Sequence, residues 1–150
     1  MIQTTTKTWR LDDARQTLAI ASTNDRCPQV IYWGPPLPAG EVLEAIAGVS
    51  QLDVTGGMLD ANPDLSLCPE AARSFPGQPS MIVRDAAGER LLPKFKLHDV
   101  AQDDTGLVIT CEDAANRLTY TAEMRIDPET HVIVMQARLN ADRAMYLHWL

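Results

Sequence analysis

The chain has 150 residues, a length typical of one domain, and its 45% hydrophobic content excludes wholesale disorder. Its 13 Lys and Arg residues against 20 Asp and Glu residues give a net charge of −7, which disfavours binding to nucleic-acid phosphates and anionic lipid heads. No apolar run approaches the roughly 18 residues of a membrane-spanning helix. We therefore expect a single domain over residues 1–150, with no nucleic acid or membrane partner; neutral sugars are compatible with this charge.

Three cysteines are scattered along the chain at Cys27, Cys68 and Cys111, without the Cys-x-x-Cys spacing of a redox or zinc motif. A disulfide framework usually has closer, paired spacing, so these thiols indicate a reducing compartment. Residues 1–10 are polar and lack the apolar core of a signal peptide. We expect buried, inert thiols and a cytoplasmic protein.

The N-terminal third of the chain predicts three short strands. Residues 6–10 and 16–21 are expected to flank a charged turn. Residues 29–33 form the third strand, which ends at Gly34-Pro35-Pro36 because proline cannot donate to a sheet ladder.

One short helix is expected over residues 41–49, where Val42, Ile46 and Val49 have helical spacing. Residues 50–80 follow with many Gly and Pro residues and almost no periodicity. A loop of this length is uncommon in a compact domain and is often functional.

Further strands are expected downstream, joined by short turns. Residues 81–84 and 91–100 predict a hairpin through a turn at 85–88, and residues 107–111 predict a shorter strand.

The clearest hairpin in the sequence joins residues 118–126 to residues 131–139 through a turn at 127–130. Both segments alternate with the period of two that is typical of half-buried strands. In the first segment the residues expected to face inward are Leu118, Tyr120, Ala122, Met124 and Ile126. In the second they are Ile133, Met135, Ala137 and Leu139.

The chain ends on an apolar, aromatic segment, residues 144–150, which predicts a final strand without a cap or charged tail. An unprotected apolar strand invites aggregation at a natural terminus, so we expect the chain to be a piece of a longer protein. Strands throughout with one helix predict an all-β fold, an antiparallel sandwich.

Motifs for nucleophilic or phosphate chemistry are missing from the sequence. It contains no Gly-x-Ser-x-Gly elbow, and Gly56-Gly57 is not followed by the lysine of a phosphate loop. His98, His131 and His148 lack metal-ligand spacing. We expect no metal and no cofactor.

Paired carboxylates are the other catalytic signal, because retaining glycoside hydrolysis needs two of them about 5 Å apart. Adjacent acidic residues occur at 12–13, 103–104 and 112–113, and all three pairs flank turns. We interpret them as solvated turn carboxylates, so the sequence names no catalytic pair.

Aromatic rings can also serve as platforms for sugars, and the chain has three tryptophans. We expect Trp9 and Trp149 to pack in the core. Trp33 ends a strand just before Gly34-Pro35-Pro36. Two interpretations stay open there: the ring packs in the core, or it faces solvent or a partner domain.

Several stretches of the sequence together resemble the N-terminal domain of family 36 glycoside hydrolases, the bacterial α-galactosidases. They are QVIYWGPPL at 29–37, LCPEAARSFPGQP at 67–79, LLPKFKLHD at 91–99, LTYTAEMRID at 118–127 and the strand at 133–139. The resemblance covers nearly the whole chain.

This resemblance implies an antiparallel β-supersandwich of the galactose mutarotase-like type. In the family, a catalytic (β/α)₈ barrel follows in the same polypeptide and carries both catalytic aspartates. The resemblance thus implies a non-catalytic domain of a retaining α-galactosidase. Its partners would be the barrel, an oligosaccharide substrate and further copies of the full-length chain.

Substrate contacts are expected from the loop at 60–78, which in some relatives reaches a neighbouring subunit's sugar pocket. The side chains that this implies are Asp60, Glu70 and Arg73, although the loop departs from the family's commoner aromatic and acidic pattern; Trp33 is a further candidate.

Two other functions stay open at this stage. One is a free-standing carbohydrate-binding module. The other is an aldose epimerase, for which His98 and Asp99 are adjacent but, as strand neighbours, face opposite ways.

Overall fold

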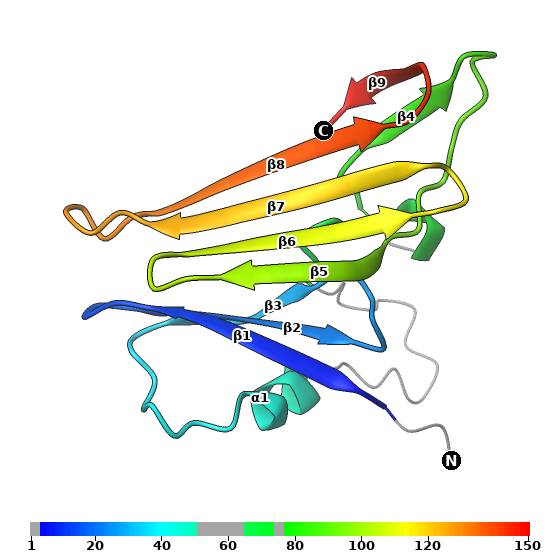
Figure 1. Ribbon diagram of the computed structural model, residues 1–150. Coiled ribbons are helices and arrows are strands. Elements are labelled where there is room, and N and C mark those ends of the chain that lie inside the picture. Colours follow the sequence, from blue (N-terminus) through cyan, green and yellow to red (C-terminus); the bar gives the residue numbers. More distant parts are fainter. Residues whose placement is uncertain (1–3, 51–64, 74–76) are drawn as a thin grey trace.

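The computed structural model describes residues 4–50, 65–73 and 77–150. Two antiparallel sheets face each other across one hydrophobic core (Figure 1). The first sheet has three strands in chain order: β1 (Thr6–Asp12), β2 (Thr17–Thr23) and β3 (Gln29–Gly34). The three strands expected in the N-terminal third are thereby confirmed.

The second sheet has four antiparallel strands, also in chain order: β5 (Lys96–Gln102), β6 (Gly106–Asp113), β7 (Leu118–Ile126) and β8 (Ile133–Ala141). The remaining strands, β4 (Ile82–Asp85) and β9 (Met145–Trp149), pair into a separate ribbon beside the end of β8 (Figure 1). The architecture is an all-β antiparallel sandwich with one α-helix among the described residues, as the sequence predicts.

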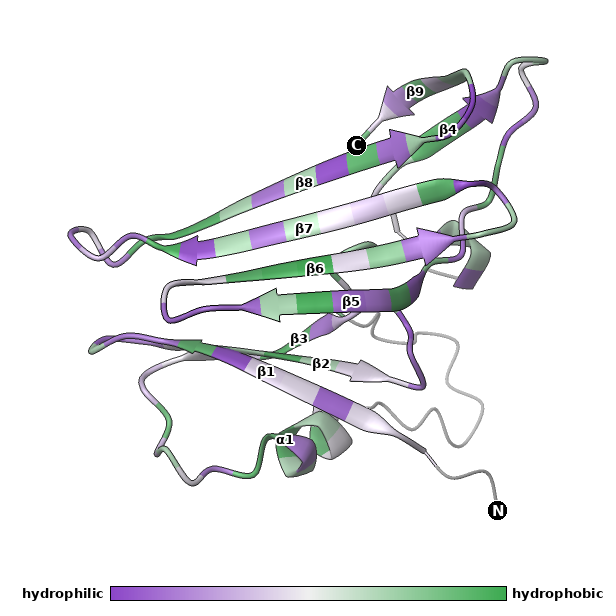
Figure 2. Ribbon diagram, viewed as in Figure 1, coloured by the Kyte–Doolittle hydropathy of each residue, from purple (hydrophilic) through white to green (hydrophobic). Residues whose placement is uncertain are grey.

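Residue alternation places the core between the two sheets. Along β7, every second residue from Leu118 to Ile126 is buried, as expected, and apolar and polar residues alternate in the second half of this strand (Figure 2). Along β6, burial alternates from Leu107 to Asp113. The hairpin of β7 and β8 is confirmed, with Met124 opposite Met135. Its turn is held by Asp127 Oδ1, which accepts the N–H groups of Glu129 and Thr130 at 2.9 Å.

The helix α1 (Leu43–Ser50) packs on the first sheet and contacts all three of its strands. Because α1 covers the face of β2 opposite the core, nearly all of β2 is buried, including Ala19 and Ala21. The predicted helix is confirmed, but its predicted face is wrong: Leu43 and Ala47 are buried, whereas Val49 is 85% exposed. The helix begins at Leu43, two residues later than expected. Residues four apart lie on the same face of a helix, so Leu43 and Ala47 face the sheet together.

The hairpin expected between residues 81–84 and 91–100 forms only in part: Leu91 N–H donates to the Val83 carbonyl at 2.9 Å and Arg84 bridges to Arg90, but the second strand begins later than expected. Its turn at 85–88 is present, with Gly88 at a positive φ of 86°. However, β4 pairs with the distant strand β9, and β5 begins only at Lys96. Pro93 explains the late start, since a proline has no N–H to give to a ladder.

The last two strands are more exposed than their patterns predict. On the core-facing side of β8, Ile133 and Leu139 are half-buried, but Met135 and Ala137 between them are exposed, contrary to the expectation. Trp149 was expected in the core and is instead 53% exposed on β9, while Trp9 packs against the core as expected. The first sheet has three strands and the second has four. The first sheet therefore does not cover β8 and β9 (Figure 1).

Two classes of feature are not found in the described part of the chain. No helix there is long and apolar enough to cross a membrane. Nor do three or more His, Cys, Asp or Glu side chains in those residues come together as a metal site.

Candidate functional site

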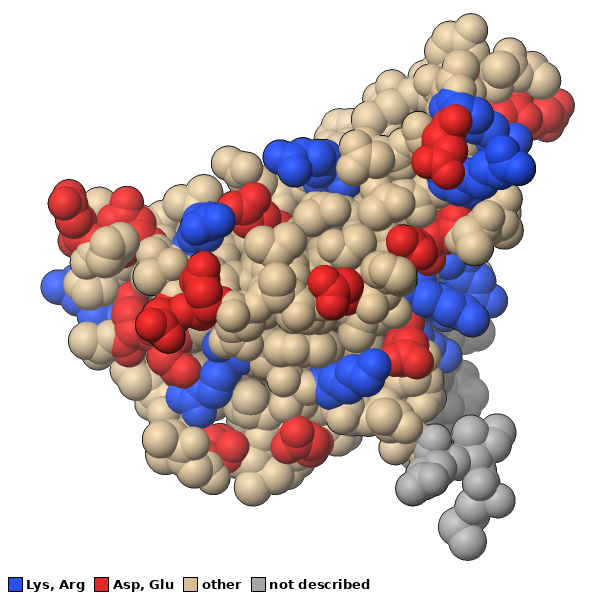
Figure 3. All heavy atoms as spheres, viewed as in Figure 1, with Lys and Arg blue, Asp and Glu red and all other residues tan. Residues whose placement is uncertain are grey.

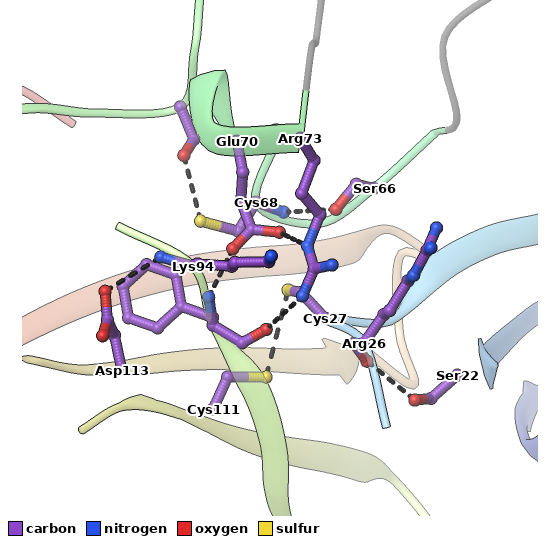
Figure 4. Close-up of polar contacts among 12 residues, drawn as sticks. Ser22, Arg26, Cys27, Ser66, Cys68, Glu70, Arg73, Lys94, Cys111 and Asp113 are labelled. Carbon is purple, nitrogen blue, oxygen red and sulfur yellow. Dashed lines mark hydrogen bonds and ion pairs between the residues drawn. The ribbon is translucent and has the colours of Figure 1, made fainter. Parts of the chain in front are cut away.

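Glu70 and Arg73 form an ion pair that holds the backbone of Phe95. Glu70 is only 7% exposed and immediately precedes the short helix η1 (Ala71–Arg73). One carboxylate oxygen accepts the Phe95 N–H, and the other pairs with the guanidinium of Arg73 (Figure 4). That guanidinium also donates to the Phe95 carbonyl at 3.0 Å. The structure thus brings two predicted site residues together, in a contact that satisfies both backbone groups of a third residue.

A second buried carboxylate, Asp113, anchors the neighbouring peptide group. Its Oδ2 accepts the Lys94 N–H at 2.9 Å, and its Oδ1 accepts the N–H groups of Ala115 and Asn116 at 3.0 and 3.1 Å. Asp113 was expected to be a solvated turn carboxylate; it does cap a turn, but it is only 4% exposed. Two carboxylates from distant segments therefore fix two consecutive N–H groups just before β5.

The electrostatics of Glu70 have opposing contributions. Burial raises the pKa of Glu70, whereas the bond from the Phe95 N–H and the positive charge of Arg73 act in the opposite direction. A raised carboxyl pKa suits a general acid. However, the hollow beside Glu70 has room for about one water molecule, far less than a sugar ring needs. These contacts favour a structural role for Glu70 and Arg73.

The three cysteines converge beside this ion pair, although they come from distant segments (Figure 4). The Sγ atoms of Cys111 and Cys27 are 3.9 Å apart, and Cys68 Sγ lies 3.0 Å from Ser80 Oγ. Contact with Cys111 raises the pKa of Cys27, and contact with Cys27 together with burial raises the pKa of Cys68. The prediction of buried thiols is confirmed.

We expect these thiols not to react while the chain is folded, because only the thiolate is nucleophilic and burial blocks access. A disulfide reagent that reports free thiols should detect none in the native chain and three after unfolding. The variant Ala86→Cys, on an exposed turn, is the positive control and should be labelled at once. Rapid labelling of the unsubstituted folded chain would contradict the expectation.

Trp33 lies apart from the ion pair of Glu70 and Arg73. Gln29, at the start of β3, forms a β-bridge with Ser66, which is close to Glu70 in the chain. Trp33 is four residues further along β3, so it lies about 13 Å from Gln29 along the strand. The Trp33 ring is 60% exposed, and its Nε1 donates to Gln16 Oε1 at 2.9 Å.

Asp60 lies outside the described residues, as do positions 51–64 and 74–76 generally. The loop predicted over 50–80 is therefore described only in part. Its described portions are 65–73, which holds η1, and 77–80.

Sequence reasoning missed the residues that surround Trp33 and Glu70. Gln16 and His131 contact each other from turns that are far apart in the chain, and Asp113 reaches Lys94 across two strands. No local pattern in the sequence indicates such pairings. The acidic turn motifs at 12–13 and 112–113 can be recognised in the sequence, but the contacts of Asp13 with His131 and of Asp113 with Lys94 cannot.

Comparison with known families identifies the domain. Residues 26–149 match the family described as "Glycosyl hydrolase family 36 N-terminal domain". The chain belongs to this family. The matched region contains all the stretches that carry the resemblance found in the sequence, so that prediction is confirmed. No curated protein sequence matches the chain.

Two solved structures share the fold of this family 36 domain. The family 36 α-galactosidase of Geobacillus stearothermophilus, solved with raffinose, is 16% identical, with a TM-score of 0.71 over 94% of the chain. The α-galactosidase of Lactobacillus brevis is 18% identical, with a TM-score of 0.70 over 95% of the chain. The chain spans 23% of the length of each enzyme.

Proposed function

We propose that this chain is the non-catalytic N-terminal part of a larger retaining α-galactosidase that releases terminal α-linked galactose from oligosaccharides. The observation that carries the proposal is the family match over residues 26–149, in a chain that spans about a quarter of two α-galactosidases. In this proposal a (β/α)₈ barrel of the same polypeptide supplies catalysis, and the domain supports it. The buried, free thiols suit the cytoplasm as its location.

The carboxylates of the described turns support this division of labour. Asp13, Asp85, Asp103 and Asp127 each accept backbone N–H groups of their own turns. Such bonds use Oδ1 of each carboxylate and stabilise the turns, which is the usual structural role of Asp at these positions.

The chain alone should therefore release no nitrophenol from a chromogenic α-galactoside, whereas the enzyme that includes the barrel should. Release by the purified 150-residue chain at a rate proportional to its concentration would overturn the proposal.

An exposed apolar surface on β8 and β9 supports packing against another domain or subunit. Tyr146, Leu147 and Trp149 on β9 are 60, 50 and 53% exposed, and Met135 on β8 is 47% exposed. Isolated exposed apolar residues are ordinary, but several large aromatic and aliphatic side chains exposed on two consecutive strands are typical of an interface. In this proposal the surface, called here the β8–β9 face, receives the barrel or a second copy of the enzyme.

A charged substitution on the β8–β9 face tests whether this face is an interface. In the full-length enzyme, Leu147→Asp should lower the unfolding temperature by several degrees, since a charge would be buried without a partner. In the isolated chain the same change should have almost no effect, because the side chain is half exposed. His148→Asp, at an exposed position of the same strand, is the matched control. Equal shifts in the enzyme and the isolated chain would exclude an interface there.

The proposed wall of the sugar pocket rests on the loop at 60–78 and, within it, on Asp60. The internal contacts of Glu70 and Arg73 support a different contribution from these two residues. They hold residues 70–73 of the loop against the segment just before β5.

A further inference from the structure

Four side chains from three separate turns meet at one end of the sandwich. Gln16 Oε1 accepts the indole N–H of Trp33 at 2.9 Å, and Gln16 Nε2 donates to the His131 carbonyl. His131 Nδ1 lies 3.0 Å from Asp13 Oδ2. The β1–β2 turn, the end of β3 and the β7–β8 turn are thereby joined into one surface.

Trp33 presents a rigid aromatic face on that surface. Its ring is 60% exposed although its N–H is bonded, so Gln16 fixes the ring without covering it. The chain that follows is also held, because the Tyr32 hydroxyl donates to the Pro35 carbonyl at 2.8 Å. A ring ordered in advance loses little conformational entropy when a ligand stacks on it.

Polar groups with both donors and acceptors are linked to the ring through Gln16. The side chains of Asp13 and His131 are 13 and 28% exposed, and their mutual contact uses only Nδ1 of the imidazole. Carboxylate, amide and imidazole groups beside an exposed indole are suited to a ligand with one apolar face and hydroxyl groups at its edge, which describes a pyranose ring.

The charge at this end of the molecule selects against anions. Acidic residues gather on the turns of β1–β2, β5–β6 and β7–β8 (Figure 3). They are Asp12, Asp13, Asp103, Asp104, Asp127 and Glu129. Arg10, Arg15 and Arg125 lie among them, and the remaining excess of negative charge disfavours phosphorylated or uronic sugars and leaves neutral ones unaffected.

We propose that Trp33, with Asp13, Gln16 and His131 around it, is a surface site that binds neutral saccharides. The choice of a saccharide as ligand rests on the proposed function, because a glycosidase gains from holding an oligosaccharide outside its catalytic centre. The site does not include Glu70 or Arg73, and it requires neither the barrel nor a second subunit.

Titration of the full chain with raffinose tests the site, read in ¹H–¹⁵N spectra from the indole N–H signals and, for the variants, from the backbone N–H signals of Gln16 and His131. We expect a saturable shift of the Trp33 signal, in the millimolar range, with little change at Trp149. Trp33→Ala should weaken binding about tenfold or more. Gln16→Ala should weaken it roughly threefold by freeing the ring. The control Trp149→Ala, at a residue that is 53% exposed on β9 against 60% for Trp33, should bind like the unsubstituted chain.

Three outcomes would overturn the site: no saturable shift, an equal shift with glycerol, or equal affinity for galactose 6-phosphate. None of them bears on the proposed function, which is read from galactoside hydrolysis and from the Leu147→Asp enzyme. Conversely, Trp33→Ala should leave the unfolding temperature of the chain unchanged, so a loss of binding is not a loss of fold.

Discussion

Glu70→Ala should lower the free energy of unfolding by about 3 kcal/mol at neutral pH, because it removes one partner of a buried ion pair. The change leaves the Phe95 N–H without its acceptor and the Arg73 guanidinium without its counterion. Urea denaturation followed by fluorescence measures the loss. Glu129→Ala, on the exposed β7–β8 turn, is the matched control and should stay within about 0.5 kcal/mol.

The pH dependence of the same position has a definite sign. Burial raises the pKa of Glu70 above its ordinary value of 4.5, so the folded chain binds this proton more tightly than the unfolded chain. The resulting stabilisation is complete below the ordinary value and is lost as pH rises through the raised pKa. The difference in the free energy of unfolding between the unsubstituted chain and Glu70→Gln should therefore widen as the pH falls from the raised pKa towards the ordinary value of 4.5.

A Glu70→Ala variant as stable as the unsubstituted chain would contradict the structural role. It would also return Glu70 to the set of candidates for substrate contact. The double variant Glu70→Ala with Arg73→Met separates the loss of the acceptor for the Phe95 N–H from the loss of the counterion for Arg73. It should cost less than the sum of the single changes, because it leaves no unpaired charge.

Local patterns were sufficient to predict most strands. The bounds of β7 were predicted residue for residue at 118–126, because alternation, the Asp127 turn and burial all agree there. The three strands of the first sheet were placed within a few residues, since charged turns and Gly34-Pro35-Pro36 mark their ends. Period-two alternation with a turn at each end is information carried within a few residues.

Pairings between distant segments could not be predicted in the same way. The partner of β4 is β9, and nothing near residues 82–85 indicates Met145. The exposure of Trp149 and Met135 likewise depends on how far the first sheet extends, which is a property of the whole fold. Pro93 was the one local signal that could have shortened the predicted strand at 91–100.

In the candidate site too, single residues could be predicted from the sequence, whereas their contacts with distant segments could not. Glu70 and Arg73 were identified together because the resemblance placed both in one loop, and their spacing lets them pair. Their contact with Phe95 was not foreseeable, and it is this contact that favours a structural role. Trp33 was identified by its place before Gly34-Pro35-Pro36, whereas Gln16 and His131 joined it only through the fold.

Phe95→Ala should be the most damaging single change among those considered, with a loss of about 4 kcal/mol. Phe95 is 0% exposed, and its ring centroid lies 5.8 Å from that of Tyr120. Tyr120 in turn donates from its hydroxyl to the Leu67 carbonyl at 2.8 Å, so the ring pair joins β7 to the segment that carries Glu70. Alanine would leave a cavity between the two sheets.

Urea denaturation again gives the measurement, with an unchanged slope showing that the folded state stays compact. Phe95→Leu fills most of the cavity and should lose less than half as much, which keeps the test informative if the alanine variant does not fold. Leu147→Ala removes a side chain that is 50% exposed on β9 and should cost far less than Phe95→Ala. Equal losses at Phe95 and Leu147 would mean that the Phe95 ring is not the centre of this core. In that case the two carboxylate anchors before β5 would hold a segment of no special importance to the fold.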